Sequence, residues 1–233
     1  MPIRARAGRV LGRDHLLRAA NCQDSHALYH DDQYTVGIVC DGCGEGANSE
    51  FGAAAAAHFL SGAAVRLLWA GVAPADLPTA LYARLQEMLG GLLALIAPPN
   101  QITFIRDYLL FTVLGVVVAE GQAVIFAAGD GLIAIDEAII RRDEGNAPRY
   151  PAYHLLDVPH QPADLPSAFD VYPVPAGWRR LAVGSDGFDP VLLPQTWGFT
   201  NARALQRKMN VWNDQEHRFR DDATLITVEE VQA

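Results

Sequence analysis

Residues 34–50, YTVGIVCDGCGEGANSE, predict a β-strand, a glycine-rich turn and the first turn of a helix. The strand part is rich in β-branched residues, and its period of two places Val36, Ile38 and Cys40 on one face. Asp41 stands where this strand ends, and the glycine after it lets the backbone turn sharply beside whatever the carboxylate holds. The stretch therefore predicts a carboxylate held at a fixed place on the edge of a sheet.

The rest of the chain predicts layers of helices and antiparallel strands. Ser49–Trp69 is rich in alanine and leucine, with Asn48 or Ser49 as a suitable cap. Leu77–Ile96 repeats leucines at spacings of three and four until Pro98, and the short connection predicts an antiparallel helix pair. We expect a strand or arm in 1–20, strands at 34–40, 109–118, 123–127, 132–135, 152–156, 180–183 and 224–228, a hairpin at 118–124 and a late helix at 201–212. Helices and strands in separate blocks indicate an α+β fold.

The composition indicates one well-buried domain over residues 1–233. Half of the residues are hydrophobic and 19% are charged, which is too few charges for a disordered chain. The net charge of −9 argues against nucleic acid or an anionic membrane as partner. The longest apolar run, Tyr108–Ala119, is shorter than the roughly 20 residues that cross a bilayer, and the basic N-terminus lacks the apolar region of a signal peptide. We therefore expect a soluble cytoplasmic protein.

The cysteines and histidines show no strong metal or redox motif. Cys40 and Cys43 form a C-x-x-C, which fits a redox pair or, with Cys22, part of a zinc site. The Asp-Gly at the centre of that motif is better explained as a turn at a strand end, so we interpret the cysteine spacing as coincidence. The seven histidines, His15 among them, lack the spacings of zinc hydrolases and are expected to be surface or partly buried residues.

Four short segments place aspartate at the edge of an apolar run. Asp41, Asp130 and Asp186 each precede a glycine, and Asp221 precedes Asp222, which we interpret as a cap or turn residue. A single Asp-Gly is usually an ordinary turn. The set, spread over the whole chain, favours carboxylates that converge on hard cations, because Mg²⁺ and Mn²⁺ prefer carboxylate and carbonyl oxygen.

These segments resemble, in order, the motifs of the metal-dependent protein phosphatases, the PPM or type 2C family. The matching segments are Asn21–Ser25, Val39–Gly44, Gly129–Gly131, Ser185–Gly187 and Asp221–Thr224. The resemblance covers about the whole chain, and the second motif is most similar to a compact bacterial branch. It implies a four-layer α-β-β-α sandwich, in which two antiparallel sheets are flanked by antiparallel helix pairs and metals bind at one end between the sheets.

The resemblance also implies a role for each aspartate. Asp41 would bridge two Mn²⁺ or Mg²⁺ ions, and the carbonyl of Gly42 would bind one of them. Asp186 and Asp221 would bind the first ion. Asp24 would lie close by and hold water on the metal. The catalytic set would therefore be Asp41, Asp186 and Asp221, with two cations aiming a water at phosphorus and no nucleophilic side chain needed.

Other positions are weaker or depart from the family pattern. Asp130 would make a third metal site together with Asp186. Arg18 is the candidate phosphate contact, although it lies one position further upstream than the family's arginine. Cys43 stands where eukaryotic members carry a histidine proposed as general acid, and Gln23 replaces a glutamate that binds water on the second metal.

The implied activity is dephosphorylation of phosphoserine and phosphothreonine in a signalling protein, with a serine/threonine kinase as the opposing enzyme. Two alternatives remain open: a catalytically weak regulatory domain that binds a phosphoprotein, and a hydrolase of a small phosphorylated metabolite. The proline-rich segment 141–175, where bacterial relatives carry a flap, is expected to be irregular.

Overall fold

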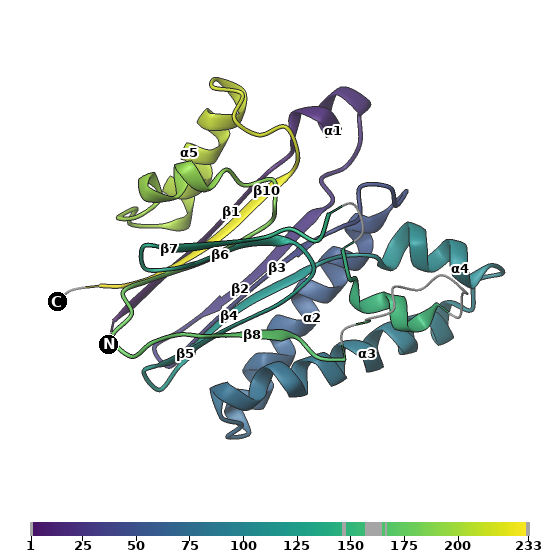
Figure 1. Ribbon diagram of the computed structural model, residues 1–233, viewed down its shortest axis with the longest axis horizontal. Helices are drawn as coiled ribbons and strands as arrows, with labels where there is room; N and C mark the ends of the chain where they lie inside the picture. The colour runs from purple at the N-terminus through teal and green to yellow at the C-terminus, as the bar shows by residue number, and fades with distance from the viewer. Residues whose placement is uncertain (1, 146–147, 157–164, 166, 232–233) are drawn as a thin grey trace.

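The computed structural model describes residues 2–145, 148–156, 165 and 167–231 as two stacked antiparallel sheets between helices (Figure 1). The first sheet contains, in spatial order, β2 (Asp24–His30), β3 (Tyr34–Asp41), β4 (Val113–Ala119), β5 (Gln122–Ala128) and β8 (Asp170–Pro173). The second contains β1 (Ile3–Val10), β10 (Ala223–Glu230), β9 (Arg180–Gly184), β6 (Gly131–Ile135) and β7 (Ala138–Arg142). The predicted sandwich of two antiparallel sheets is confirmed.

Helices cover the outer faces of both sheets. α2 (Ser49–Trp69) and α3 (Leu77–Ile96) lie on the first sheet, and α5 (Ala202–Asp214) lies on the second (Figure 1). The shorter helical segments are α1 (Arg13–Arg18), η1 (Pro74–Asp76), α4 (Gln101–Phe104), η2 (Ile105–Leu109), η3 (Pro151–Leu155) and η4 (Pro190–Gln195). In the described part of the chain, the second outer layer therefore consists of α5 with the short η4 rather than two long helices.

Three apolar layers hold this stack together. Side chains alternate along each strand, so β3 contributes to two of them. Val36, Ile38 and Cys40 share one face, as predicted, and this face packs against α2 and α3. Val39 points between the sheets toward Ile226 and its neighbours. The third layer joins the second sheet to α5. Two of the aspartates stand at the ends of these strands, because Asp24 begins β2 and Asp41 ends β3.

The α2 helix is an internal part of this stack. By length and composition alone this helix could cross a membrane, but 56% of its most apolar 18-residue stretch is buried inside the protein. It packs on β2, β3 and α3. Gly52 lets α2 pack closely against the backbone of Tyr108, because a Cβ atom at Gly52 would lie 2.2 Å from the carbonyl oxygen of Tyr108. The apolar surface of α2 is thus explained by the core that it covers.

The predicted helices at 49–69 and 77–96 have the bounds that the structure shows, and the hairpin at 118–124 is confirmed as β4 and β5. Asn48 is at the cap position of α2 without a side-chain capping bond, and the Ser49 hydroxyl instead donates to the carbonyl of Cys43 (2.9 Å). The first predicted segment, 1–20, contains β1 and α1.

Two of the strand predictions differ from the structure. The prediction of a strand at 152–156 is wrong, because Pro151 begins the 3-10 helix η3, where the fixed φ of proline suits a helical start. The strand predicted from 109 begins at Val113, after the π-helical turn η2. The irregular segment predicted at 141–175 contains η3 and β8, and its residues 146–147, 157–164 and 166 lie outside the described residues.

Candidate active site

The predicted metal-binding residues meet at one end of the sandwich. A cavity of about 110 Å³ there is lined by Asp41, Gly42, Asp130, Asp186 and Asp221, together with His15. These residues come from the end of β3, the β5–β6 turn, the turn after β9, the turn before β10 and the short helix α1. Segments as far apart in the sequence as His15 and Asp221 meet here because antiparallel strands place their ends at the same edge of a sheet.

Asp24 and Asp41 form the buried base of this site. They are directly opposite each other in the β2–β3 pair, and Asp24 is only 1% exposed. The Ser185 hydroxyl donates to Oδ2 of Asp24 (2.6 Å) and itself accepts the backbone N–H of Thr224 (2.9 Å). Oδ1 of Asp24 is buried and has no hydrogen-bond partner in the described structure. A buried carboxylate oxygen without a hydrogen-bond donor is costly, and a bound cation can compensate its charge.

The electrostatics of this base favour a positive charge. Burial raises the pKa of Asp24 to about 7. Burial also raises the pKa of Asp41 well above its usual value, with the nearby charges of Asp24 and Asp186 adding to the effect. Carboxylates crowded together in a low dielectric repel one another. A divalent cation among them would remove this penalty, since it is the largest local charge in such a site.

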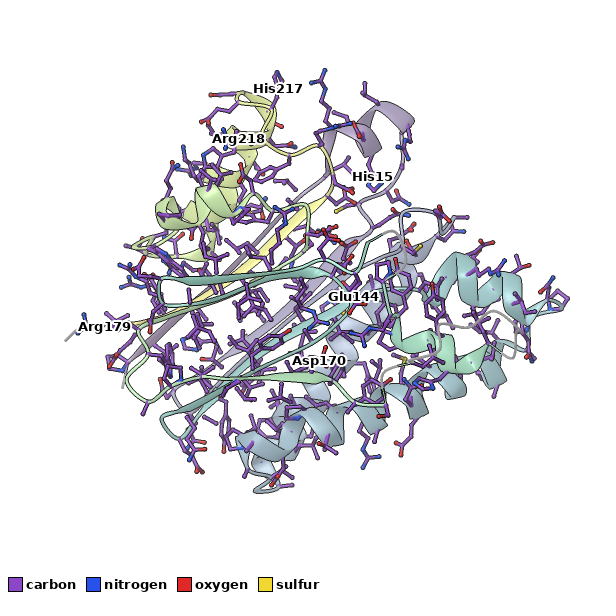
Figure 2. The ribbon with its side chains drawn as sticks, in the orientation of Figure 1. His15, Glu144, Asp170, Arg179, His217 and Arg218 are labelled. Carbon is purple, nitrogen blue, oxygen red and sulfur yellow. The ribbon has the colours of Figure 1, made fainter. Side chains whose placement is uncertain are left out.

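Asp130 joins the site to the segment that follows β7. Its Oδ1 accepts the backbone N–H of Glu144 (2.6 Å), and burial raises its pKa to about 6. Glu144 in turn accepts the backbone N–H of Arg149 (2.7 Å) and is paired with the Arg149 and Arg142 guanidinium groups (2.6 and 3.1 Å). Figure 2 shows Glu144 among side chains at this end of the molecule. The loop over the cavity is therefore anchored to one of the candidate ligands.

Asp222 does not line the cavity and instead binds backbone groups beside it. It is 3% exposed, and its two oxygens accept the backbone N–H groups of Gly12 (2.7 Å) and Gln23 (2.6 Å). Gly12 allows this approach, because a Cβ atom there would lie 2.1 Å from the backbone carbon of Asp221. Asp222 was interpreted as a cap or turn residue, but its bonds go to distant backbone groups and link residues 12–23 to the start of β10.

His15 was the main residue that sequence reasoning missed. It was expected at the surface or partly buried, but it is 7% exposed and lines the cavity, below α1 in Figure 2. Its Nδ1 lies 2.7 Å from Oδ2 of Asp222, and its Nε2 lies 3.9 Å from Oδ1 of Asp221. No spacing in the sequence indicates this contact, because His15 and Asp222 are joined only by the tertiary fold.

Arg18 and the three cysteines are not among the residues that line the cavity. Arg18, the sequence candidate for phosphate binding, is exposed on the last turn of α1 and does not line the cavity. All three cysteines are free thiols. Cys40 is in the core beneath α2, where burial raises its pKa, so it is unsuited to either redox or metal chemistry.

Gln23 occupies the position where the family resemblance expects a glutamate. Its Nε2 donates to the carbonyl of Gly46 (2.9 Å), which braces the glycine-rich turn after β3. Its Oε1 is buried and has no partner in the described structure. With Asp24, it gives the site two unsatisfied buried oxygens, and oxygen donors of this kind fit Mg²⁺ or Mn²⁺.

Comparison with known proteins agrees with this geometry. The family model described as Protein phosphatase 2C matches residues 11–144, which is more than half of the chain. A bacterial serine phosphatase has a similar structure (TM-score 0.65, 14% identity, all of both chains covered). So does the serine/threonine phosphatase Stp1 from Staphylococcus aureus (TM-score 0.61, 13% identity, 100% of this chain and 96% of that one).

A third solved structure, RsbX in complex with magnesium, matches with a TM-score of 0.58 and 12% identity over 97% of this chain and 94% of that one. No curated protein sequence matches the chain significantly. At these identities the structural likeness shows the fold, and the family model carries the assignment. The chain belongs to the protein phosphatase 2C family.

Proposed function

We propose that residues 1–233 form one metal-dependent phosphatase domain that hydrolyses phosphoserine and phosphothreonine in a protein. The observation that carries the proposal is one cavity lined by Asp41, Asp130, Asp186 and Asp221, which come from four separate segments. Burial raises the pKa values of Asp41, Asp130 and Asp221, and carboxylates perturbed in this way within a cleft are candidates for a functional site. We further propose a cytoplasmic location and a serine/threonine kinase as the opposing enzyme.

Asp41, Asp186, Asp221 and the carbonyl of Gly42 would hold two cations, Mn²⁺ or Mg²⁺, and Asp130 with Asp186 would form a weaker third site. When bound, two such ions lower the pKa of water and neutralise charge on the phosphoryl group. Asp24 would orient the water through its free Oδ1, since its other oxygen is held by the Ser185 hydroxyl. The backbone of Asp41 is itself fixed, because its carbonyl accepts the N–H of Thr112 (2.8 Å).

The shape of the cavity favours a protein substrate over a small metabolite. At about 110 Å³ it is well below the ~300–1,000 Å³ typical of pockets that enclose small molecules. A pocket of this size has room for a phosphoryl group at the end of a side chain while the rest of the substrate stays outside. Pro148 and Tyr150, which line the same cavity, would contact the residues next to the phosphorylated one.

Release of phosphate from a phosphothreonine peptide tests the proposal. Wild type is compared with Asp41→Asn and with Asp31→Asn, an exposed aspartate in the β2–β3 hairpin, in Mn²⁺, in Mg²⁺ and in EDTA. Turnover should need metal, vanish in Asp41→Asn and persist in Asp31→Asn. Equal turnover in EDTA, or full activity of Asp41→Asn, would contradict the mechanism. Faster release from sugar phosphates or nucleotides than from the peptide would favour a metabolite hydrolase.

A regulatory domain that binds a phosphoprotein is the second candidate. It is favoured by one observation: among the described residues that line the cavity, none is lysine or arginine, and Arg18 lies outside it. Without a guanidinium clamp, a phosphoryl group would rely on metal ions alone for binding. Tight binding of the peptide in Mn²⁺ with no phosphate release, by a folded protein, would favour this second candidate.

A further inference from the structure

We propose that His15 is a nitrogen ligand to a cation held by Asp221, and that Asp222 orients the imidazole for this role. The inference rests on the metal site of the proposed function and adds a donor of a different chemical class to it. It also predicts which metals the site prefers. The three residues stand close together: one ligand atom from each lies within 4.8 Å of the others.

The hydrogen bonds of Asp222 fix which nitrogen of His15 carries a proton. Both oxygens of Asp222 already accept a backbone N–H, from Gly12 and from Gln23. A carboxylate that receives such donors acts as an acceptor, so Nδ1 of His15, 2.7 Å from Oδ2, donates to it. With the proton on Nδ1, Nε2 is the nitrogen whose lone pair is available to a metal.

Nε2 faces a partner that cannot satisfy it. Oδ1 of Asp221 lies 3.9 Å from Nε2, which is too far for a hydrogen bond, and it is itself an acceptor. Two acceptors that face each other across this distance are both satisfied by a cation between them. Gln23 supplies an independent sign of a missing ligand, because it is 8% exposed, lines the same cavity and leaves Oε1 without a partner.

The backbone around His15 is rigid enough for a ligand role. The N–H groups of Arg13 and Asp14 donate to the carbonyls of Phe219 and Arg220 (3.2 and 2.8 Å), which ties the start of α1 to the segment before Asp221. A carboxylate that orients a metal-bound histidine through its second nitrogen is a common supporting arrangement, and its loss typically lowers metal affinity about 10–100-fold.

An imidazole ligand changes the preference of the site. Carboxylate and carbonyl oxygens alone suit Mg²⁺ and Mn²⁺, whereas nitrogen favours the transition metals. We therefore expect the site beside Asp221 to bind Mn²⁺ in clear preference to Mg²⁺. His15→Gln should lower the ratio of Mn²⁺ to Mg²⁺ affinity at least about tenfold, while Asp222→Asn should have the same direction of effect by loosening the ring.

Pulsed EPR of the Mn²⁺-loaded protein tests the inference without depending on turnover. Wild type with natural histidine should show coupling of the manganese to ¹⁴N, and protein grown with ¹⁵N-histidine should show the ¹⁵N coupling instead. His15→Gln should bind Mn²⁺ without nitrogen coupling. His58→Gln, which changes an exposed histidine on α2, is the matched control and should keep it.

The outcomes separate this inference from the proposed function. Mn²⁺ bound by wild type with no nitrogen coupling, or coupling that persists in His15→Gln, would overturn the role of His15 and leave the carboxylate site standing. No Mn²⁺ binding by folded wild type would overturn both. If His15→Gln does not fold, the isotope exchange in wild type still decides between coordination and its absence.

Discussion

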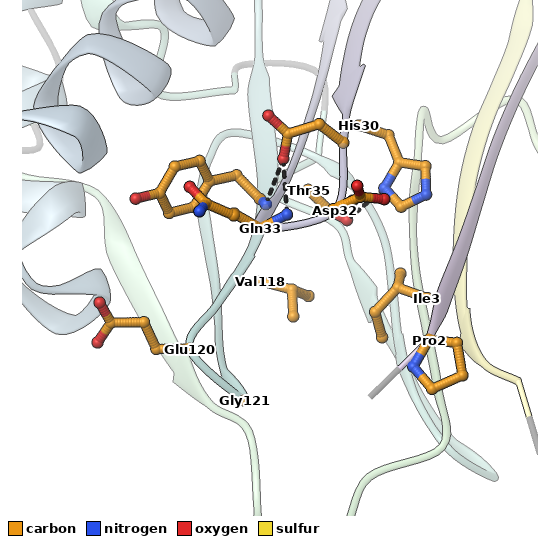
Figure 3. Close-up of a pocket in the computed structure, with 11 residues that line it drawn as sticks. Pro2, Ile3, His30, Asp32, Gln33, Thr35, Val118, Glu120 and Gly121 are labelled. Carbon is orange, nitrogen blue, oxygen red and sulfur yellow. Dashed lines mark hydrogen bonds between the residues drawn. The ribbon is translucent and has the colours of Figure 1, made fainter.

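The two ends of the β-sandwich both gather acidic residues, but they differ in how those acids are satisfied. At the end opposite the site, a cavity of about 580 Å³ is lined by Asp31, Asp32 and Glu120 of two hairpin turns (Figure 3). Asp31 is exposed and accepts three hydrogen bonds, from the N–H groups of Gln33 (2.8 Å) and Tyr34 (2.7 Å) and the Tyr29 hydroxyl (2.5 Å).

The difference supports the smaller cavity as the proposed functional site. The Tyr29 hydroxyl and the two backbone donors lower the pKa of Asp31, because their hydrogen bonds stabilise the ionised carboxylate. These bonds also stabilise the turn between β2 and β3. At the site, burial raises the pKa of Asp24 to about 7, and one of its oxygens has no partner. Acidic residues indicate a metal site when their charge is left uncompensated, whatever the volume of the space beside them.

Replacing one carboxylate at each end of the sandwich should reveal the largest difference in activity. Asp186→Asn should reduce metal-dependent phosphate release at least about a thousandfold, because residues that act as one catalytic unit are not replaceable singly. Asp31→Asn should leave the rate unchanged. Circular dichroism confirms that both variants fold. Comparable activity of the two would mean that the ends of the sandwich do not differ in function.

Metal binding should stabilise the protein through the end of the sandwich that contains Asp41, and not through the end that contains Asp31. Mn²⁺ at about 100 times its dissociation constant should raise the free energy of unfolding by about 2.7 kcal/mol. Thermal melts with and without Mn²⁺ should show this gain in wild type and in Asp31→Asn, but not in Asp41→Asn. A gain that survives in Asp41→Asn would place the cation elsewhere.

The stability of the metal-free protein should depend on pH through Asp24 at the site, and not through Asp31 at the other end. A folded carboxyl with a raised pKa keeps its proton when the unfolded chain has lost it, so stability falls as pH rises between the ordinary pKa of 3.8 and the value of about 7 for Asp24. Denaturant melts in EDTA should show this decline. Asp24→Asn should reduce it, and Asp31→Asn should not. A stability that rises steadily over pH 4–7 in both variants would contradict the raised pKa.

Arg18→Ala is the smallest expected effect. The side chain is exposed and outside the cavity, so neither KM nor kcat for the phosphothreonine peptide should change appreciably. Steady-state kinetics checks this. A large rise in KM with kcat unchanged would instead support Arg18 as the phosphate contact that the family resemblance implies.

The parts of the fold that were predicted depend on local patterns. The bounds of α2 follow from its alanine- and leucine-rich composition, and those of α3 from the spacing of its leucines, together with the glycine and proline residues after each helix. The aspartates at strand edges were visible because each stands beside a glycine or a second aspartate. The repeated aspartate edges suggested that the carboxylates converge, and the family resemblance supplied the place, since a strand pattern alone does not reveal which strand ends meet.

The parts that were missed depend on contacts between distant residues. Asp222 binds Gly12, Gln23 and His15 across about 200 positions, and no local pattern encodes such a pairing. The composition of 152–156 resembles a strand, but Pro151 and the packing of Ala152 in the core favour a 3-10 turn. Local propensity was outweighed there by tertiary packing.

Anomalous scattering from crystals soaked in Mn²⁺ tests the central claim most directly, because it locates cations at either end of the sandwich. We predict peaks in the cavity lined by Asp41, Asp186 and Asp221, and no peak beside Asp31 and Asp32. Peaks only at the hairpin end, or no peak between Asp41 and Asp221 at saturating Mn²⁺, would contradict the account.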